Sequence, residues 1–233
     1  MSAPRRPART HEARIVSRVI RWGLLLAFVA QIGSTLLSSE PTLAQASQLD
    51  QGRQLFQVNC SSCHGIDASG TENDGPSLQG AGPAAVDFML TSGRMPLGDP
   101  NDQPTRQPPK FSGSEIDALV AYVGSIAPDG PAIPVVDTSG GDLPTGMKLF
   151  VNTCASCHGA GATGDSVGGG QIAPSLYPPD PTQIGEAVRV GPGVMPKFGT
   201  KTLSDADVNS IARYLLSLRN DETGSYRGGL PHA

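Results

Sequence analysis

Apolar residues recur at helical spacing near the end of each half of the chain. They occupy Ile116, Leu119, Val120, Val123 and Ile126 in the first half and Val208, Ile211, Ala212, Leu215 and Leu218 in the second. Spacing of i, i+3, i+4 and i+7 predicts one amphipathic helix at each place. Ser112 with Glu115, and Ser204 with Asp207, stand where N-capping side chains begin a helix. Each half is therefore predicted to close with a capped helix.

The two helical patterns belong to a longer internal repeat. Residues 52–65 match residues 146–159 at an offset of 94, and three shorter matches follow downstream. These are Gly75–Leu78 with Ala173–Leu176, Arg94–Pro96 with Val194–Pro196, and Pro109–Phe111 with Pro196–Phe198. The repeat predicts two copies of one domain, at 47–128 and 142–220. A Pro- and Gly-containing linker at 129–141 joins them, and a flexible tail at 221–233 follows.

A glycine and an aromatic residue one turn later open each copy. The pairs are Gly52 with Phe56 and Gly146 with Phe150. Glycine removes the side chain that would keep two helices apart, so a close crossing is expected there. The partners are the two closing helices, which carry Tyr122 and Tyr214. We expect these six residues to be structural.

The first copy carries 13 residues that the second lacks, at 97–109. This insert has four prolines and no apolar face, so an extended surface loop is expected. Tolerated growth of a loop and a docking element for a partner both fit this pattern.

The N-terminus has a different composition from the rest. Residues 1–46 carry six arginines and two glutamates, and an apolar run of 16 residues follows the arginines at 22–37. Ala44–Ala46 has the small-residue pattern of a peptidase site, so residues 1–46 are predicted to be a secretory signal peptide. The alternative is an uncleaved anchor through 22–37, which is shorter than the ~20 residues of a comfortable span. Either form exports the remainder to the outer side of the membrane.

Composition narrows the classes of function. Gly (29) and Pro (21) are too frequent for a coiled coil or helical repeat array, and 38% hydrophobic residues argue against wholesale disorder. Residues 47–233 have a net charge of −8. An acidic body lacks the positive field that binds phosphates, so nucleic acid is not an expected partner.

All four cysteines fall in two C-x-x-C-H motifs, Cys60/Cys63/His64 and Cys154/Cys157/His158. Two thiols at this spacing add across the two vinyl groups of one haem, and the following histidine becomes the proximal iron ligand. Three alternatives compete. Disulfides do not require the histidines, a redox dithiol would sit beside a βαβ pattern, and zinc would need further ligands that only His11 and His232 offer. The motifs therefore predict two covalently bound haems c.

The sixth iron ligand follows by elimination, because no cysteine is left and the mature body offers only His232 as a further histidine. Methionine remains, with Met89, Met95, Met147 and Met195 as candidates. Met147 lies on the helix entering the second motif and Met89 lies in a predicted short core helix. Met95 and Met195 occupy equivalent places before proline and are the predicted distal ligands. A His/Met haem has a raised potential and no open position, so one-electron transfer is expected and no catalytic residue is assigned.

Pro76 and Pro174 follow the two histidines at similar intervals. Their carbonyl groups are placed to accept a hydrogen bond from Nδ1 of His64 and His158, which would fix the imidazole tautomer. A simple turn proline is an equally good interpretation of the spacing.

With these motifs in both halves, the sequence resembles a tandem class I cytochrome c. It is most similar to the di-haem cytochrome cc subunit of actinobacterial-type cytochrome bc complexes. The more specific residues are Ser92–Pro96 with its insert, Pro108–Phe111 and Met195–Phe198. The resemblance implies an all-α fold of two domains, each with a few short helices around one haem. It also implies thioethers at Cys60, Cys63, Cys154 and Cys157, and the axial pairs His64/Met95 and His158/Met195.

In that family the subunit passes electrons from the Rieske centre to the terminal oxidase. The resemblance therefore implies cytochrome b, a Rieske protein and an oxidase or another cytochrome as partners, as part of a quinol–cytochrome c reductase. A free or tethered shuttle, or a subunit of an exported dehydrogenase, uses the same chemistry. A haem enzyme such as a peroxidase is the remaining class, and it requires a haem with a labile or absent ligand.

Overall fold

The computed structural model describes residues 40–178 and 180–225, with side chains from 43 to 178 and from 180 to 218. The chain separates into a segment that ends at Ser47 and a body from Gln48 onward. The predicted basic region and apolar run of the leader lie outside the described residues. The predicted peptidase site, Ala44–Ala46, lies in the first turns of helix α2. No helix in the described part of the chain is long and apolar enough to cross a membrane.

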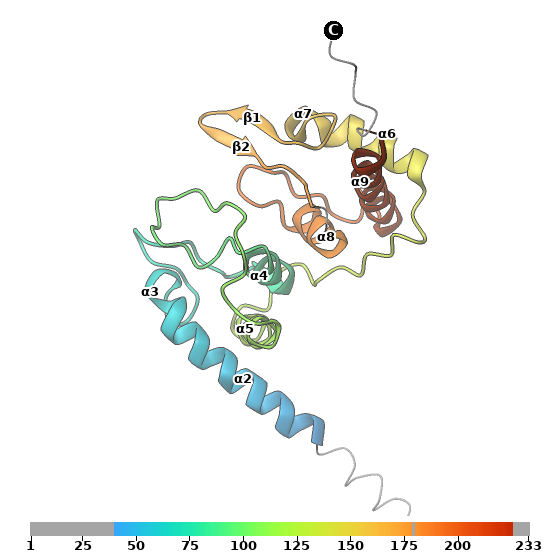
Figure 1. The fold of residues 1–233 in the computed structure, drawn as a ribbon. Coiled ribbons are helices and arrows are strands. Elements are labelled where there is room, and N and C mark those ends of the chain that lie inside the picture. The colour runs from blue at the N-terminus through green and yellow to red at the C-terminus, as the bar shows by residue number, and fades with distance from the viewer. Residues whose placement is uncertain (1–39, 179, 226–233) are drawn as a thin grey trace, which may run out of the picture. The chain divides into compact units, whose positions relative to one another are not determined.

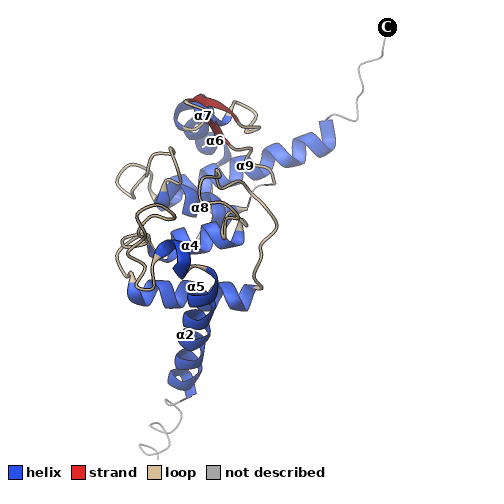
Figure 2. Cartoon of the chain, turned by 90° about the vertical axis from the view of Figure 1, so that its left-hand side faces the viewer, coloured by secondary structure: helices blue, strands red, loops and turns tan. Residues whose placement is uncertain are grey.

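The body is mostly helical (Figures 1 and 2). The first half contains α2 (Glu40–Asn59), α3 (Ser61–His64), α4 (Gly82–Thr91) and α5 (Gly113–Ile126). The second half contains α6 (Leu143–Thr153), α7 (Ala155–His158), β1 (Asp165–Gly168), β2 (Gln171–Ala173), α8 (Pro181–Val190) and α9 (Asp205–Ser225). Apart from the short β1–β2 pair, this is the helical fold that the sequence predicts.

The β1–β2 hairpin was not predicted. Its strands are antiparallel, with Asp165 opposite Ala173, and Gly168–Gly170 make the turn. All three glycines have φ between 58° and 88°, the left-handed region that favours glycine. Two strands of four and three residues lack the length for a detectable alternation of apolar and polar positions, so periodicity gave no signal.

Both predicted closing helices begin at their predicted caps. Glu115 accepts hydrogen bonds from the Ser112 backbone N–H at 2.8 Å and from its hydroxyl at 2.7 Å. The exchange is reciprocal in both halves, since Ser112 and Glu115 form a capping box and Ser204 and Asp207 make the same contacts. Asp207 accepts from the Ser204 backbone at 2.9 Å, and the Ser204 hydroxyl accepts from the Asp207 N–H at 3.2 Å. These contacts satisfy N–H groups that a helix start leaves unpaired.

The predicted close crossings are confirmed. A Cβ at Gly52 would lie 2.0 Å from the Ala118 carbonyl oxygen, and one at Gly146 would lie 1.9 Å from that of Ser210. Only glycine permits backbones this close. The aromatic neighbours stack alongside in tilted pairs, with ring centroids 5.5 Å apart for Phe56–Tyr122 and 5.6 Å for Phe150–Tyr214.

Each half has its own hydrophobic core. The first is built from Phe56, Ala68, Leu90, Ile116, Leu119, Val123 and Ala127. The second is built from Phe150, Ala162, Val188, Leu203, Val208, Ile211, Tyr214 and Leu215. We call the two halves lobe 1 and lobe 2. The domain limits proposed from the sequence, 47–128 and 142–220, remain a prediction.

The segment predicted as a linker contains no helix or strand, but it is fixed at several points. Pro131 accepts a hydrogen bond from the Ala84 N–H of α4 at 3.1 Å, and the Asp137 N–H donates to Asn209 Oδ1 of α9 at 3.0 Å. The insert 97–109 is an irregular loop, as expected, and its Gln107 N–H donates to the Ser92 carbonyl at 3.1 Å. The role of the insert in docking stays untested.

Candidate haem sites

Each C-x-x-C-H motif forms a single helical turn. The turns are α3 and α7, and each follows directly on the helix before it, because the first cysteine donates its N–H to the preceding aromatic residue. The distance is 2.8 Å both for Cys60 to Phe56 and for Cys154 to Phe150. The histidine N–H then donates to the carbonyl of the first cysteine of its motif at 2.9 Å in both lobes. One turn therefore carries both thiols and the imidazole.

The four cysteines are free thiols. Cys60 and Cys154 pack against the cores of their lobes, whereas Cys157 is exposed. Burial raises the pKa of the Cys60 thiol to about 11, and Cys63 adds to the shift. Burial and Cys157 raise the pKa of Cys154 to about 11 in the same way. In each turn the first cysteine packs against the core, and in lobe 2 the second cysteine is exposed.

Each of the two histidines is oriented by a hydrogen bond at its Nδ1 atom. His64 Nδ1 lies 2.8 Å from the Pro76 carbonyl oxygen, and His158 Nδ1 lies 3.0 Å from that of Pro174. A carbonyl only accepts, so Nδ1 carries the proton and Nε2 keeps its lone pair for an iron. The carbonyl role proposed for the two prolines is confirmed.

The loop after each histidine repeats closely and contains residues that the sequence analysis missed. Ala68 and Ala162 have φ of 59° and 57°, are fully buried, and stand four residues past their histidines. The next turn is closed by Gly70 N–H to His64 carbonyl at 2.8 Å and by Gly164 N–H to His158 carbonyl at 2.9 Å. Left-handed backbone is unfavourable for alanine, so packing imposes it. The repeated alanine at the same offset was a usable signal.

The methionines differ in surroundings. Met95 packs against the lobe 1 core and Met195 against the lobe 2 core, each on the loop that follows α4 or α8. Met147 is 48% exposed on α6. Met89 lies within α4, where its carbonyl accepts the Met95 N–H at 3.1 Å. This placement favours Met95 and Met195, and their ligand role stays a prediction.

Comparisons with known proteins agree with this duplicated geometry. The family model of cbb3-type cytochrome c oxidase subunit III matches twice, at residues 47–123 and 141–215. The cytochrome bc1 complex cytochrome c subunit of Mycobacterium tuberculosis is 36% identical over 91% of this chain and 82% of that protein. The chain belongs to the family of di-haem cytochrome c subunits.

Two further relatives have lower sequence identity to this chain. The bc1 complex cytochrome c subunit of Corynebacterium efficiens is 32% identical over 86% of this chain and 76% of that protein. Subunit FixP of the cbb3-type oxidase of Sinorhizobium medicae is 28% identical over 85% of this chain and 73% of that protein. A solved cytochrome c4 from Pseudomonas stutzeri is 20% identical over 72% of this chain and 96% of that one, with a TM-score of 0.26.

The residues present in this cytochrome c suit two haems c. Each lobe offers paired cysteines on one turn, a histidine whose Nδ1 is occupied, and a methionine against the same core. Within the described residues, no three His, Cys, Asp or Glu side chains gather as a metal site.

Each lobe contains an arginine whose side chain is largely shielded from solvent. In lobe 2 both terminal nitrogens of Arg189 have partners. Nη1 donates hydrogen bonds to the Phe198 and Leu203 carbonyls at 2.9 and 2.7 Å, and Nη2 forms an ion pair with Asp205 at 2.6 Å. Arg94 of lobe 1 is 7% exposed and lies over the Phe88 ring, 4.8 Å from its centroid. Sequence reasoning assigned neither arginine a role.

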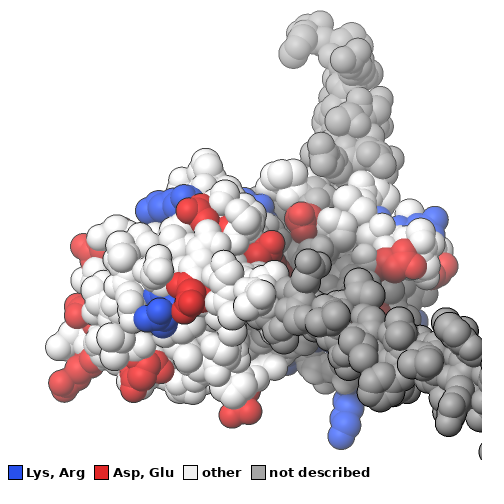
Figure 3. Space-filling view, turned by 90° about the horizontal axis from the view of Figure 1, so that it is seen from below, with Lys and Arg blue, Asp and Glu red and all other residues white. Residues whose placement is uncertain are grey.

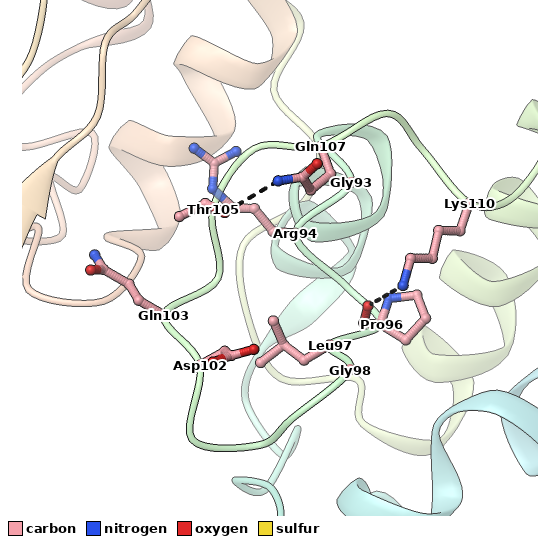
Figure 4. Close-up of a pocket in the computed structure, with 10 residues that line it drawn as sticks. All are labelled: Gly93, Arg94, Pro96, Leu97, Gly98, Asp102, Gln103, Thr105, Gln107 and Lys110. Carbon is pink, nitrogen blue, oxygen red and sulfur yellow. Dashed lines mark hydrogen bonds between the residues drawn. The ribbon is translucent and has the colours of Figure 1, made fainter.

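A pocket of about 370 Å³ opens beside Arg94, between the start of the insert and its end (Figure 4). Lys110 Nζ closes one side by donating to the Pro96 carbonyl at 3.0 Å. None of the predicted thioether or axial residues lines this pocket. It is therefore a feature of the insert, separate from the C-x-x-C-H turn.

The lobes meet where α4 contacts α8. Gln183 Nε2 donates to Thr91 Oγ1 at 3.2 Å across this contact. Beside it lies Glu186, which is fully buried. Burial raises the pKa of the Glu186 carboxyl to about 10, with Asp87 of α4 and then Asp180 adding to the shift. Glu186 is therefore a neutral acid at physiological pH.

Proposed function

We propose that this chain is a di-haem cytochrome c that relays single electrons from a quinol-oxidising bc complex toward a terminal oxidase. The observation that carries the proposal is the duplicated turn in which histidine Nδ1 is bound by a proline carbonyl. The assignment to a bc complex rests on the 36% identity to bc1 complex cytochrome c subunits.

In this proposal two cysteines of each turn hold one haem through thioether bonds, Cys60 with Cys63 and Cys154 with Cys157. The axial pairs are His64 with Met95 and His158 with Met195. A haem c with this ligation supplies reversible exchange of one electron at a raised potential. No catalytic residue is assigned to the chain itself.

The protein contributes orientation and ligand strength. The hydrogen bond from Nδ1–H to the Pro76 or Pro174 carbonyl fixes which nitrogen is free and makes the imidazole more basic. The close crossings at Gly52 and Gly146 hold each C-x-x-C-H turn at the end of a helix that is packed against the closing helix. Both devices reduce rearrangement when the iron changes its charge.

The proposed partners are a cytochrome b, a Rieske protein and an oxidase or another cytochrome, on the outer face of the membrane. Acidic side chains are spread over the face shown in Figure 3, and residues 47–128 carry a net charge of −5. Such a surface attracts basic partners and speeds their encounter. The proposal has two forms for the N-terminus. Either residues 22–37 remain and anchor the protein to the membrane, or the segment is cleaved off as part of a signal peptide.

Purification of the affinity-tagged chain from its native membranes tests the proposal. We expect two covalently bound haems per chain by the pyridine haemochrome assay, together with a cytochrome b and a Rieske protein. Recovery in a soluble fraction without salt, and without those partners, would support the shuttle instead. Carbon monoxide binding to the reduced protein would contradict a filled sixth position at both haems.

A further inference from the structure

Arg94 is a buried cation that lacks a counter-charge. Its side chain is 7% exposed, and its Nη1 atom has no hydrogen-bond acceptor among the described residues. The contact with Phe88 engages the flat face of the guanidinium and leaves the N–H groups in its plane unused. Figure 4 shows the guanidinium directed away from Leu97 and Lys110, with no hydrogen bond to another residue of the pocket.

A buried charge without a partner is unfavourable, because it has lost its hydration and gained no counter-charge. The described part of lobe 1 is rich in carboxylates, yet none forms an ion pair with Arg94. The charged residue that acts on the guanidinium most strongly is Arg106, which has the same sign. The missing partner is therefore an anion that the polypeptide itself does not supply at this place.

The position of Arg94 in the chain indicates what the anion is. Arg94 directly precedes Met95, on the loop that approaches the lobe 1 core. A haem c carries two propionate carboxylates, and the planar guanidinium fork matches a carboxylate with two parallel hydrogen bonds. A bound haem therefore brings the anion with it.

Lobe 2 has no arginine at the position directly before its predicted methionine ligand. Val194 stands where lobe 1 has Arg94, and it is 66% exposed. The buried arginine of lobe 2, Arg189, has its Nη1 committed to two carbonyls and its Nη2 to Asp205. An unpaired arginine directly before the methionine is thus found in lobe 1 and not at the equivalent position of lobe 2.

We propose that Arg94 binds a propionate of the lobe 1 haem and thereby makes that haem easier to reduce. The proposal rests on the haem content given under Proposed function. The cation favours the ferrous form, because reduction lowers the charge of the haem by one unit.

The test is the pair of midpoint potentials in wild-type and Arg94→Gln holoprotein, measured by spectroelectrochemistry. At the wild-type midpoint of the affected haem, we expect the ratio of reduced to oxidised haem to fall about tenfold, which corresponds to 59 mV. The other midpoint stays unchanged. The affected midpoint is the one that Met95→Ala also lowers, which assigns it to lobe 1.

Two control variants separate this role from others. Arg53→Gln removes an exposed lobe 1 cation that pairs with Asp50 at 3.1 Å, so it tests net charge alone. Arg94→Lys keeps the charge but loses the flat stacking surface. A propionate contact predicts that Lys restores most of the potential, whereas a purely structural support of Phe88 predicts that Lys fails like Gln.

A spectroscopic readout reports the contact itself. In redox-difference infrared spectra of protein with ¹³C-labelled propionates, the labelled carboxylate bands should shift in both Arg94→Gln and Arg94→Lys but not in Arg53→Gln. If the Arg94→Gln variant fails to incorporate its haems, the same infrared band shift can still be measured in the Arg94→Lys variant. Unchanged bands in every variant that matures, or unchanged midpoints in Arg94→Gln, would overturn the proposal. A wild-type protein without two haems would instead refute the proposed function.

Discussion

The two lobes share the geometry of the C-x-x-C-H turn, which carries the predicted proximal histidine, and they differ around the predicted methionine ligands. On the proximal side the Cys-to-aromatic hydrogen bond is 2.8 Å in both lobes, and the His–Pro contacts are 2.8 and 3.0 Å. On the methionine side lobe 1 has a buried, unpaired Arg94 and a Pro-rich insert, whereas lobe 2 has the exposed Val194 and a fully paired Arg189. The comparison shows that the C-x-x-C-H side of the duplicated domain is kept in both copies, whereas the methionine side has diverged in burial and charge.

Removal of either methionine is the strongest way to break the comparison. Met95→Ala or Met195→Ala should each remove one axial ligand and lower the potential of one haem, within the range of about 0.8 V that axial ligands control. The oxidised protein should lose part of its weak methionine–iron absorption band, and the reduced protein should bind carbon monoxide at one site. Met147→Ala is the control, since Met147 is 48% exposed on α6. An unaltered band in both variants would refute the ligand assignment.

Substitutions at the two helix crossings test whether Gly52 and Gly146 are equally important for the stability of their lobes. Gly52→Ala and Gly146→Ala place a Cβ 2.0 and 1.9 Å from a carbonyl oxygen, so each should destabilise its lobe by about 1–3 kcal/mol. Unfolding in guanidinium, monitored at the haem bands, measures this. Gly113→Ala is the matched control, because a Cβ there meets nothing within 4 Å. A stable Gly146→Ala variant would contradict the described packing.

The contact between the lobes should depend on pH through Glu186. Its pKa is raised from 4.5 to about 10, so the folded protein holds a proton that the unfolded chain releases above about pH 4.5. The free energy of unfolding should therefore fall as pH rises from about 4.5 toward 10, by about 4 kcal/mol between pH 5 and 8. Glu186→Gln, which mimics the neutral acid, should remove this slope.

The same titration of Glu72→Gln serves as the control, since Glu72 is an exposed glutamate of lobe 1. If Glu186→Gln keeps the wild-type slope, the carboxyl is not neutral at the contact between α4 and α8.

The smallest expected difference lies at the two caps. Ser204→Ala removes both the hydroxyl donor to Asp207 and the acceptor for its N–H, so a cost of about 1 kcal/mol is expected. Ser112→Ala removes the hydroxyl of the equivalent capping box with Glu115 and keeps the backbone bond at 2.8 Å, so a similar cost of about 1 kcal/mol is expected. Thermal unfolding of the two variants measures both costs, and an unchanged stability in either variant would contradict its cap.

Much of the site was predictable because its geometry is local in the chain. The C-x-x-C-H spacing, the caps at Ser112 and Ser204, and the glycine–aromatic pairs act over one or two helical turns, where covalent geometry limits the outcome. The His–Pro contacts span 12 and 16 residues, and there the sequence left two interpretations open. The β1–β2 hairpin and the left-handed alanines escaped prediction, because short strands and packing-imposed backbone leave little periodic signal.

By itself, the sequence determined that the protein carries two copies of the C-x-x-C-H motif, and it predicted which residue types would hold each haem. The tertiary structure decided which charges lose their water and which find a partner. Arg94 and Glu186 are ordinary charged residues in the sequence, and their burial results from elements distant along the chain. Solvation and counter-charge depend on that three-dimensional neighbourhood, so only the fold shows that one lacks an anion and the other keeps a proton.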